Sequence, residues 1–288
     1  MHAEGAIGII GGSGLYEMEG LSVGEEVAVA TPFGSPSDAY VVGELEGREV
    51  IFLPRHGRGH RIMPHELNFR ANVYGFRKLG VTRLVAVSAV GSLKEEIRPR
   101  HVVLPDQFID RTQGRAGTFF GDGIVAHIAF GDPVCPELHA ALAEAAGSCG
   151  TQVWPGGSYV CIQGPAFSTR AESELFRSWG ASVVGMTNLP EARLAREAEM
   201  CYATVALVTD FDCWHQTEES VTAEMILENL RANVSTARRL LCRLVAQLPA
   251  RRSCQCGEAL AKALVTPPQS MPAEARHRLD VMLGKYLQ

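Results

Sequence analysis

The chain has 288 residues, of which 46% are hydrophobic and 20% are charged, and its 27 basic and 32 acidic residues give a net charge of −5. This composition is typical of a folded globular protein and excludes a disordered, collagen-like or coiled-coil chain. Because no block of like charge stands out, we expect no nucleic-acid or membrane partner. No run of about 18 apolar residues and no signal-like N-terminal segment is present, which favours a cytoplasmic location.

Apolar runs alternate with segments of helical periodicity along the chain. Strands are predicted at 7–10, 49–53, 83–87 and 203–208, and helices at 66–79, 136–148, 169–179, 190–200 and 222–248. Such alternation indicates an α/β fold with a parallel or mixed sheet. No linker divides the chain, so we expect one domain over residues 1–249. The tail, 250–288, has helical periodicity over 273–287 and is expected to pack on the same domain.

Eight cysteines are present, and six of them stand singly among apolar residues. This pattern predicts buried free thiols in a reducing compartment. A zinc site is typically built from paired spacings such as two CxxC motifs, which the chain lacks, so no metal site is predicted. Cys254 and Cys256 lie two apart in a polar segment that we expect to be exposed. They are either a redox-active or disulfide-forming pair or two ordinary thiols.

Two loops that follow the first two strands contain groups suited to phosphate. Gly11–Gly14, with the Ser13 hydroxyl, is either an anion cradle or a tight strand-to-helix turn. After the second strand, Arg55 could clamp a phosphate, and His56 could donate to phosphate or ribose. The alternative is an exposed basic loop. Two glycines between His56 and His60 disfavour a helix there, and with it a metal site.

Three further segments combine small, polar and apolar residues at predicted strand ends. Ser88 ends a buried strand and would suit phosphate, or it begins a small-residue turn. Phe167 could stack on a planar base or simply pack, and Thr169 with Glu172 predicts a capping box. Met186 could contact a sugar, although packing in the core is the default interpretation.

Asp210 and Asp212 give the sharpest local signal. They lie two apart at the end of an apolar strand, so both are expected on one face, with Cα atoms roughly 6.6 Å apart. A carboxylate pair in a half-buried cleft raises at least one pKa and keeps an acid protonated at neutral pH. A leaving heterocycle needs such an acid. A metal-binding or helix-capping pair is the alternative.

In this order, the motifs GGSG, RHGRGH, SAVGSLKEE, GPAFSTRAES, GMTNLPE and VTDFDCW resemble those of the S-methyl-5'-thioadenosine phosphorylases, a family of trimeric purine nucleoside phosphorylases. The similarity spans nearly all of residues 5–248. It implies a single α/β domain with a mixed, partly barrel-like sheet flanked by helices. It also implies a homotrimer, in which His127 of the Gly-rich segment 121–131 could enter a neighbour's pocket.

The resemblance assigns site residues by position. Phosphate contacts fall on Ser13, Arg55, His56, Ser88, Ala89 and Thr187. Nucleoside contacts fall on Phe167, Ser168, Met186, Asp210 and Asp212, with His60 and Ala223 near the 5' end of the ribose. Four positions depart from the family pattern. Ser13 and Ser88 stand where Thr is common, which preserves the hydroxyl. Ala166 stands where an Arg is common, and Ala223 where a larger Val is common, so the pattern fixes the preference at the 5' substituent less firmly than the base preference.

The implied reaction is reversible phosphorolysis of S-methyl-5'-thioadenosine to adenine and 5-methylthioribose 1-phosphate, a pentosyl transfer of purine and methionine salvage. Phosphate is a co-substrate, and no metal or organic cofactor is expected. Protonated Asp210 would donate to purine N7, and Asp212 would support it or accept from the 6-amino group. The first alternative is a 6-oxopurine nucleoside or methylthioinosine phosphorylase, in which Asn is usual at position 210. The second is a nucleoside-binding regulator without turnover.

Overall fold

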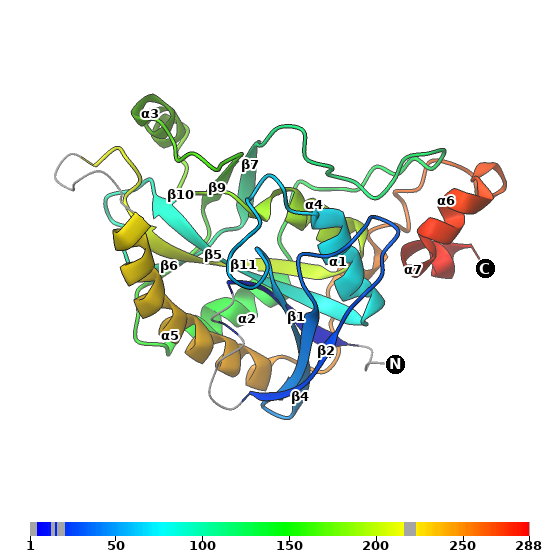
Figure 1. Cartoon of the computed structure of the whole chain (residues 1–288), viewed down its shortest axis with the longest axis horizontal. Helices are drawn as coiled ribbons and strands as arrows, with labels where there is room; N and C mark the ends of the chain where they lie inside the picture. Colours follow the sequence, from blue (N-terminus) through cyan, green and yellow to red (C-terminus); the bar gives the residue numbers. More distant parts are fainter. Residues whose placement is uncertain (1–4, 13–14, 16–20, 216–222, 288) are drawn as a thin grey trace.

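A computed structural model describes residues 5–12, 15, 21–215 and 223–287. They form one mixed sheet with helices on both faces (Figure 1). The strands are β1 (Ala6–Gly11), β2 (Ser22–Val27), β3 (Tyr40–Leu45), β4 (Arg48–Pro54), β5 (Val81–Ser92), β6 (Val102–Leu104), β7 (Gln107–Arg111), β8 (Val153–Pro155), β9 (Ser158–Ile162), β10 (Val183–Gly185) and β11 (Cys201–Asp210). The α-helices are α1 (Phe69–Lys78), α2 (Pro136–Gly147), α3 (Arg170–Ser178), α4 (Asn188–Glu197), α5 (Ala223–Gln247), α6 (Ala273–Arg278) and α7 (Asp280–Leu283).

Strand β5 is the centre of the sheet. It pairs in parallel with β1 and β11, and its last residues pair antiparallel with β10. The main path runs β2-β3-β4-β1-β5-β10-β9-β7, and β11 leads to a branch through β6 and β8. Because β11 runs parallel to β5 and β10 runs antiparallel to it, the end of β11 and the segment that follows β10 both lie beside the C-terminal half of β5. This placement determines where the functional residues gather.

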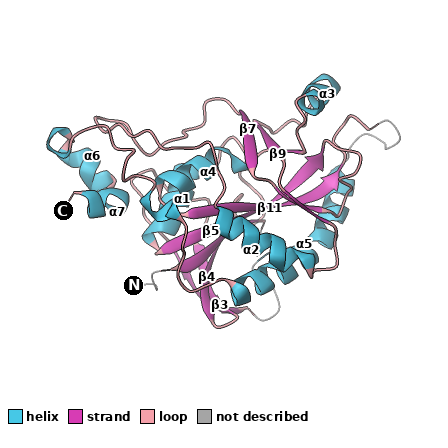
Figure 2. Ribbon diagram, turned by 180° about the vertical axis from the view of Figure 1, so that it is seen from behind, coloured by secondary structure: helices cyan, strands magenta, loops and turns pink. Residues whose placement is uncertain are grey.

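Two hydrophobic cores lie on the two faces of the sheet. Helices α1 and α4 cover one face, and α2 and α5 cover the other (Figure 2). In α5, Ala237, Leu240, Leu241 and Leu244 are all fully buried, at the spacing of one helix face. At roughly 25 cal/mol per Å² of apolar surface, such burial is the main force that holds these layers together.

The α/β fold with a mixed sheet is confirmed, and the four predicted strands are β1, β4, β5 and β11. The sheet branches at β5 toward β11, β6 and β8, and it does not close into a barrel in the described part of the chain. The edge strand β2 shows why some strands escaped prediction: its sequence, SVGEEV, is exposed along nearly its whole length and carries no apolar alternation. None of the described helices is long and apolar enough to cross a membrane.

The tail after residue 249 lies along the body rather than apart from it. Short helices η2 (Gln255–Glu258), η3 (Pro268–Ser270), α6, α7 and η4 (Gly284–Tyr286) follow one another there. Val265 N donates to Val125 O at 2.9 Å, and Lys285 Nζ lies 2.6 Å from Glu199 Oε2. Residues 273–287 are therefore helical in pieces, broken at Leu279, instead of forming one continuous helix.

Candidate active site

The predicted site residues converge on the C-terminal half of β5. Residues 81–88 of this strand are buried, but Ala89 is exposed, so the sheet opens to solvent at this point. On one side β11 places Asp210 beside Gly91, and on the other β10 pairs Val184 with the same glycine. Because β10 runs antiparallel to β5, its exit toward Met186 and Thr187 returns alongside Ala89 and Ser88.

The two aspartates are close together, although the strand does not continue between them. Asp210 is the last residue of β11, and Asp212 lies beyond it in the left-handed region with φ of 52°. Asp and Asn are among the few non-glycine residues that tolerate this conformation. The turn lets Asp212 N donate to Asp210 Oδ1 at 2.8 Å. The two carboxyl groups were expected to lie together because the strand was expected to continue through both residues. A turn after Asp210 brings them together instead.

The protonation of this pair is set by burial. Burial raises the pKa of the Asp212 carboxyl; the Ser173 hydroxyl counters this and the charge of Asp210 adds to it. Asp210 Oδ2 lies 2.7 Å from Thr209 Oγ1, which is also 3.2 Å from Val90 O. The Thr209 hydroxyl is the donor to Asp210 Oδ2, and Val90 O is a second acceptor within its reach. Burial and the neighbouring charge of Asp210 thus both favour the protonated form of Asp212.

Gly91 makes room for the aspartates. A Cβ at this position would lie 2.9 Å from Asp210 Oδ1 and 3.2 Å from Asp212 Cβ. Any side chain would therefore displace one of the two carboxyl groups. The glycine in the SAVGS motif is a spatial requirement of the aspartate pair.

Arg55 forms a buried ion pair that the sequence did not predict. Its Nε lies 2.9 Å from Glu191 Oε2 and its Nη2 3.1 Å from Glu191 Oε1, and both side chains are almost fully buried. Arg55 also donates to Val87 O and Ile10 O. Burial alone would lower the pKa of the guanidinium, but the charge of Glu191 raises it overall.

These contacts change the interpretation of Arg55. They account for four of the five N–H groups of the guanidinium. The guanidinium thus makes its bidentate contact with a carboxylate of the protein. This geometry excludes the expected bidentate contact with phosphate. One N–H group and the field of the cation remain for a bound anion.

A buried polar network extends from this ion pair to Ser88. Tyr202 donates its hydroxyl to Glu191 Oε1 at 2.9 Å and accepts from Asn188 Nδ2 at the same distance. Asn188 also donates to Thr204 and accepts from Ser88 Oγ at 3.2 Å. Satisfied networks of this kind hold their members rigidly. Ser88 and Arg55 are therefore positioned by one connected set of hydrogen bonds.

His56 is neutral and has a defined tautomer. Its Nδ1 lies 2.8 Å from Ile62 O, and because a carbonyl only accepts, Nδ1 carries the hydrogen. Burial lowers the pKa of His56 to about 4. The hydrogen bond to Ile62 O acts in the opposite direction, and the positive charge of Arg55 contributes to the decrease. Nε2 is consequently an acceptor at neutral pH, which corrects its expected role as a donor. The exposed His60 ring stacks on it at 4.3 Å.

We predict that the His56 ring, in phosphate-free buffer, titrates near pH 4 rather than near its ordinary value of 6.5. The reason is that the folded protein desolvates the imidazolium more than it stabilises it. Histidine ring resonances followed by NMR from pH 3 to 8 test this, and His56→Gln assigns the signal. A midpoint of His56 near 6.5 would contradict the buried, neutral tautomer.

Several buried polar atoms around this region have no hydrogen-bond partner in the described structure. They include Thr187 Oγ1, Ser168 Oγ and Asp212 Oδ2. Thr187 stands directly before α4 yet its side chain caps no helix N–H group. Buried polar groups are rarely left unpaired, because desolvation without a partner costs about 1–3 kcal/mol. The hydroxyls of Ser168 and Ser173 act on the Asp212 carboxyl, so Thr187 Oγ1 is the atom of this set that lacks a partner for its hydrogen.

The loop after β9 adds an aromatic surface. Phe167 is 55% exposed, which leaves its ring free for a base, and Met186 is half-buried. The predicted capping box is confirmed: Glu172 N donates to Thr169 Oγ1 at 3.2 Å and Thr169 N to Glu172 Oε2 at 2.7 Å. It fixes the start of α3 directly after the loop.

Arg115 and Glu191 are the functional residues that sequence reasoning missed. Arg115 donates to the carbonyls of Gln163, Met186 and Leu189 at 2.8 Å each, and so joins the loop after β9 to the segment after β10. No local pattern indicated this. Glu191 could have been found as an acid in the first turn of α4, on the face that the helix buries.

Two of the predicted contacts fall outside what can be described. Ser13 lies outside the described residues, and so does the side chain of Ala223. Gly11 and Gly12 precede Ser13, and Gly11 ends β1 beside the Arg55 backbone, whose N–H donates to Gly11 O at 2.9 Å. The Gly-rich turn therefore begins next to the buried ion pair.

Comparison with known proteins gives one consistent result. The family model described as the phosphorylase superfamily matches residues 6–246. S-methyl-5'-thioadenosine phosphorylase of Geobacter sulfurreducens is 55% identical and covers 99% of this chain and 100% of its own, and that of Koribacter versatilis is 57% identical, covering 99% and 97%.

Solved structures agree. A methylthioadenosine phosphorylase from an Antarctic soil metagenomic library superposes with a TM-score of 0.93 at 49% identity, covering 98% of this chain and 100% of its own. The methylthioadenosine phosphorylase of Schistosoma mansoni, solved in complex with adenine, has a TM-score of 0.84 at 38% identity, covering 93% and 99%. The chain therefore belongs to the phosphorylase superfamily and, within it, to the S-methyl-5'-thioadenosine phosphorylases.

Proposed function

We propose that this site catalyses the reversible phosphorolysis of S-methyl-5'-thioadenosine, giving adenine and 5-methylthioribose 1-phosphate. The observation that carries the proposal is the convergence of the Asp210–Asp212 pair and the unpaired Thr187 hydroxyl on the opening of β5. They supply polar contacts on two sides of one opening. Asp210 and Asp212 would meet the base, and Thr187 with Ser88 and the Ala89 backbone would meet phosphate.

The chemistry follows from this division. Cleavage of the bond between the sugar C1' and purine N9 leaves positive charge on the sugar and negative charge on the base. Phosphate, held beside Arg55, attacks C1' and its charge stabilises the cationic sugar as the new C–O bond forms. Asp210 donates its proton to N7, so the base leaves neutral. Asp212 Oδ2 accepts from the 6-amino group. Inorganic phosphate is the co-substrate, and the reaction needs no organic cofactor.

His56 fits this scheme as an acceptor. With Nδ1–H bound to Ile62 O, its Nε2 lone pair can receive a hydrogen from monoprotonated phosphate or from a ribose hydroxyl. His60 is exposed and stacks on His56, so its ring continues this side of the site toward the 5' end of the ribose. Phe167 and Met186 supply the apolar contacts to base and sugar.

We predict that the protein releases adenine from methylthioadenosine only when phosphate is present, and that it cleaves methylthioinosine more slowly. A 6-oxopurine would set a carbonyl oxygen against the acceptor at Asp212, and an unsatisfied polar pair costs about 1–3 kcal/mol, or roughly tenfold to hundredfold in kcat/KM. Product assays with the two nucleosides, adenosine and inosine, with and without phosphate, test this.

Two results would contradict the proposal. Faster cleavage of methylthioinosine would favour the 6-oxopurine alternative and overturn the role of the aspartates. Binding of methylthioadenosine without any turnover would favour a nucleoside-binding regulator.

We also propose a homotrimer located in the cytoplasm. His127 is exposed, and its backbone N–H donates to Ala263 O at 2.8 Å, so the segment that carries it is anchored to the tail while the ring stays accessible to a neighbour. The eight free thiols suit a reducing compartment. Light scattering is expected to give a mass three times that of the 31.1 kDa chain, and a stable monomer at micromolar concentration would contradict the trimer.

A further inference from the structure

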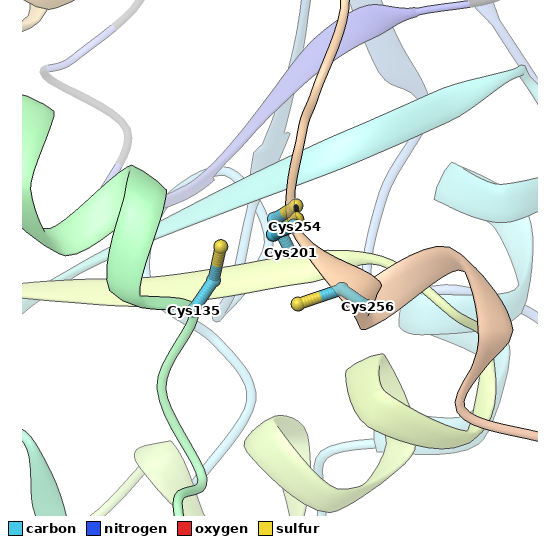
Figure 3. A group of neighbouring side chains, drawn as sticks. All are labelled: Cys135, Cys201, Cys254 and Cys256. Atoms are coloured by element: carbon cyan, nitrogen blue, oxygen red, sulfur yellow. Dashed lines mark hydrogen bonds between the residues drawn. The ribbon is translucent and has the colours of Figure 1, made fainter.

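Four cysteines from three distant parts of the chain meet at one point. Cys135 precedes α2, Cys201 begins β11, and Cys254 and Cys256 belong to the tail (Figure 3). All four Sγ atoms lie within 4.8 Å of one another, and those of Cys201 and Cys254 are 3.3 Å apart. We refer to Cys135, Cys201, Cys254 and Cys256 as the four-cysteine cluster.

The cluster corrects one expectation from the sequence and reopens the question of a metal site. The segment of Cys254 and Cys256 was expected to be exposed, but Cys256 is 7% exposed and Cys254 only partly accessible. A metal site was not predicted, because the spacing rules for zinc look for ligand pairs within short segments. Here the second pair is assembled by the fold from Cys135 and Cys201.

The backbone around the cluster is fixed by contacts that do not involve the thiols. Cys135 N donates to Tyr202 O at 2.9 Å, which ties the start of α2 to β11. Glu137 Oε2 accepts from Ser253 N at 2.6 Å and from Cys254 N at 3.1 Å, which ties the tail to α2. The thiols are thus brought together by the surrounding structure.

The spacing of the sulfur atoms suits a tetrahedral metal ion. A zinc ion about 2.3 Å from each of four sulfurs sets neighbouring sulfurs roughly 3.8 Å apart. The 3.3 Å separation of Cys201 and Cys254 and the 4.8 Å limit for the whole set bracket this value. We propose that the four-cysteine cluster binds one Zn²⁺ through four thiolates.

Electrostatics near the cluster favour thiolates. On binding, each thiol releases its proton to solvent and each sulfur gives an electron pair to the ion, so the complex carries a net charge of −2. Cys135 is the N-cap of α2, and its Sγ accepts from Leu138 N at 3.5 Å. The helix N-terminus stabilises negative charge there. Arg83, whose backbone pairs with Cys201, is a buried cation on the neighbouring strand and lies 3.4 Å from the Glu137 carboxylate, which offsets part of its charge.

The position of the cluster makes this zinc a structural ion. Cys201 is the first residue of β11 and Asp210 the last, so at roughly 3.3 Å per residue the two ends are about 30 Å apart. The ion would join the tail to α2 and β11 far from the opening of β5. Its loss should therefore lower thermal stability and leave the KM of both substrates unchanged.

The zinc content of the full-length protein, purified with reductant and without chelator, tests the proposal. Inductively coupled plasma mass spectrometry is expected to give one zinc per chain. Cys254→Ser and the double variant Cys254→Ser, Cys256→Ser should retain almost none, whereas the control Cys242→Ser, outside the cluster, should retain one. Wild type without zinc, or zinc that survives in the double variant, would overturn the proposal.

Two further measurements keep the test decisive if a variant folds poorly. Zinc is displaced from wild type with a mercurial and the protein is refilled with Co²⁺ after the mercurial is removed by thiol. A sulfur-to-cobalt charge-transfer band with the d–d pattern of a tetrahedral site is expected. Wild type unfolded without reductant should show all eight cysteines as free thiols once zinc is chelated. Four free thiols and no zinc would instead establish two disulfides and overturn the proposal.

Discussion

Asp210→Asn is expected to lower kcat/KM for methylthioadenosine by about 10²–10⁴-fold, because the amide can donate a hydrogen bond to N7 but cannot transfer a proton to it. The substitution is nearly isosteric, and the Asn oxygen can still accept from Asp212 N, which lies 2.8 Å from Asp210 Oδ1. The fold should therefore be retained. Steady-state kinetics with adenine release as the readout measures the loss.

The same variant separates proton transfer from base recognition. An amide at position 210 can donate to O6 of a 6-oxopurine, so the ratio of kcat/KM for methylthioinosine to that for methylthioadenosine should rise. Asp132→Asn, at an exposed position, serves as the control and should match wild type. If Asp210→Asn keeps wild-type activity on methylthioadenosine, the proton comes from another group.

Arg55→Ala is expected to destabilise the protein by about 3–5 kcal/mol, since it leaves the fully buried Glu191 carboxylate without its partner. It should also raise the KM for phosphate far more than the KM for the nucleoside, because no neutral group replaces the field and the remaining N–H of the guanidinium. Chemical denaturation measures the first effect and phosphate-dependent kinetics the second.

Arg58→Ala is the control for Arg55→Ala. Arg58 pairs with Glu26 at 2.8 Å, but both side chains are exposed, at 41% and 54%. Arg58→Ala should therefore cost at most about 1 kcal/mol, as exposed ion pairs do. An unchanged phosphate KM in Arg55→Ala, together with the expected loss of stability, would assign Arg55 a purely structural role. Unchanged stability would contradict the buried ion pair itself.

Much of the framework was predictable from the sequence. The strands β5 and β11 are continuous apolar runs, and α5 has one buried face, so local periodicity is enough to identify each of them. The capping box at Thr169 was also predictable, because both of its partners lie within three residues. Short strands such as β8 and β10, with three residues each, carry too few positions for any period to show.

The site residues were named as a group only because their motifs resemble a family. Their individual chemistry depended on the fold. His56 was expected to donate, but the carbonyl of Ile62 takes its Nδ1 hydrogen and burial keeps Nε2 unprotonated. Thr187 was assigned to phosphate by the resemblance alone, and the antiparallel direction of β10 is what returns it beside Ser88.

The sequence by itself determined the long buried strands and the main helices, and it determined the presence of two aspartates, an arginine and hydroxyl groups at the strand ends. Only the tertiary structure decided which of these groups meet. Arg55 and Glu191 are 136 residues apart in the chain, and Cys201 and Cys254 are 53 apart. Local patterns extend over a few turns or one strand, whereas pairings at such separations follow from how the sheet orders its strands around β5.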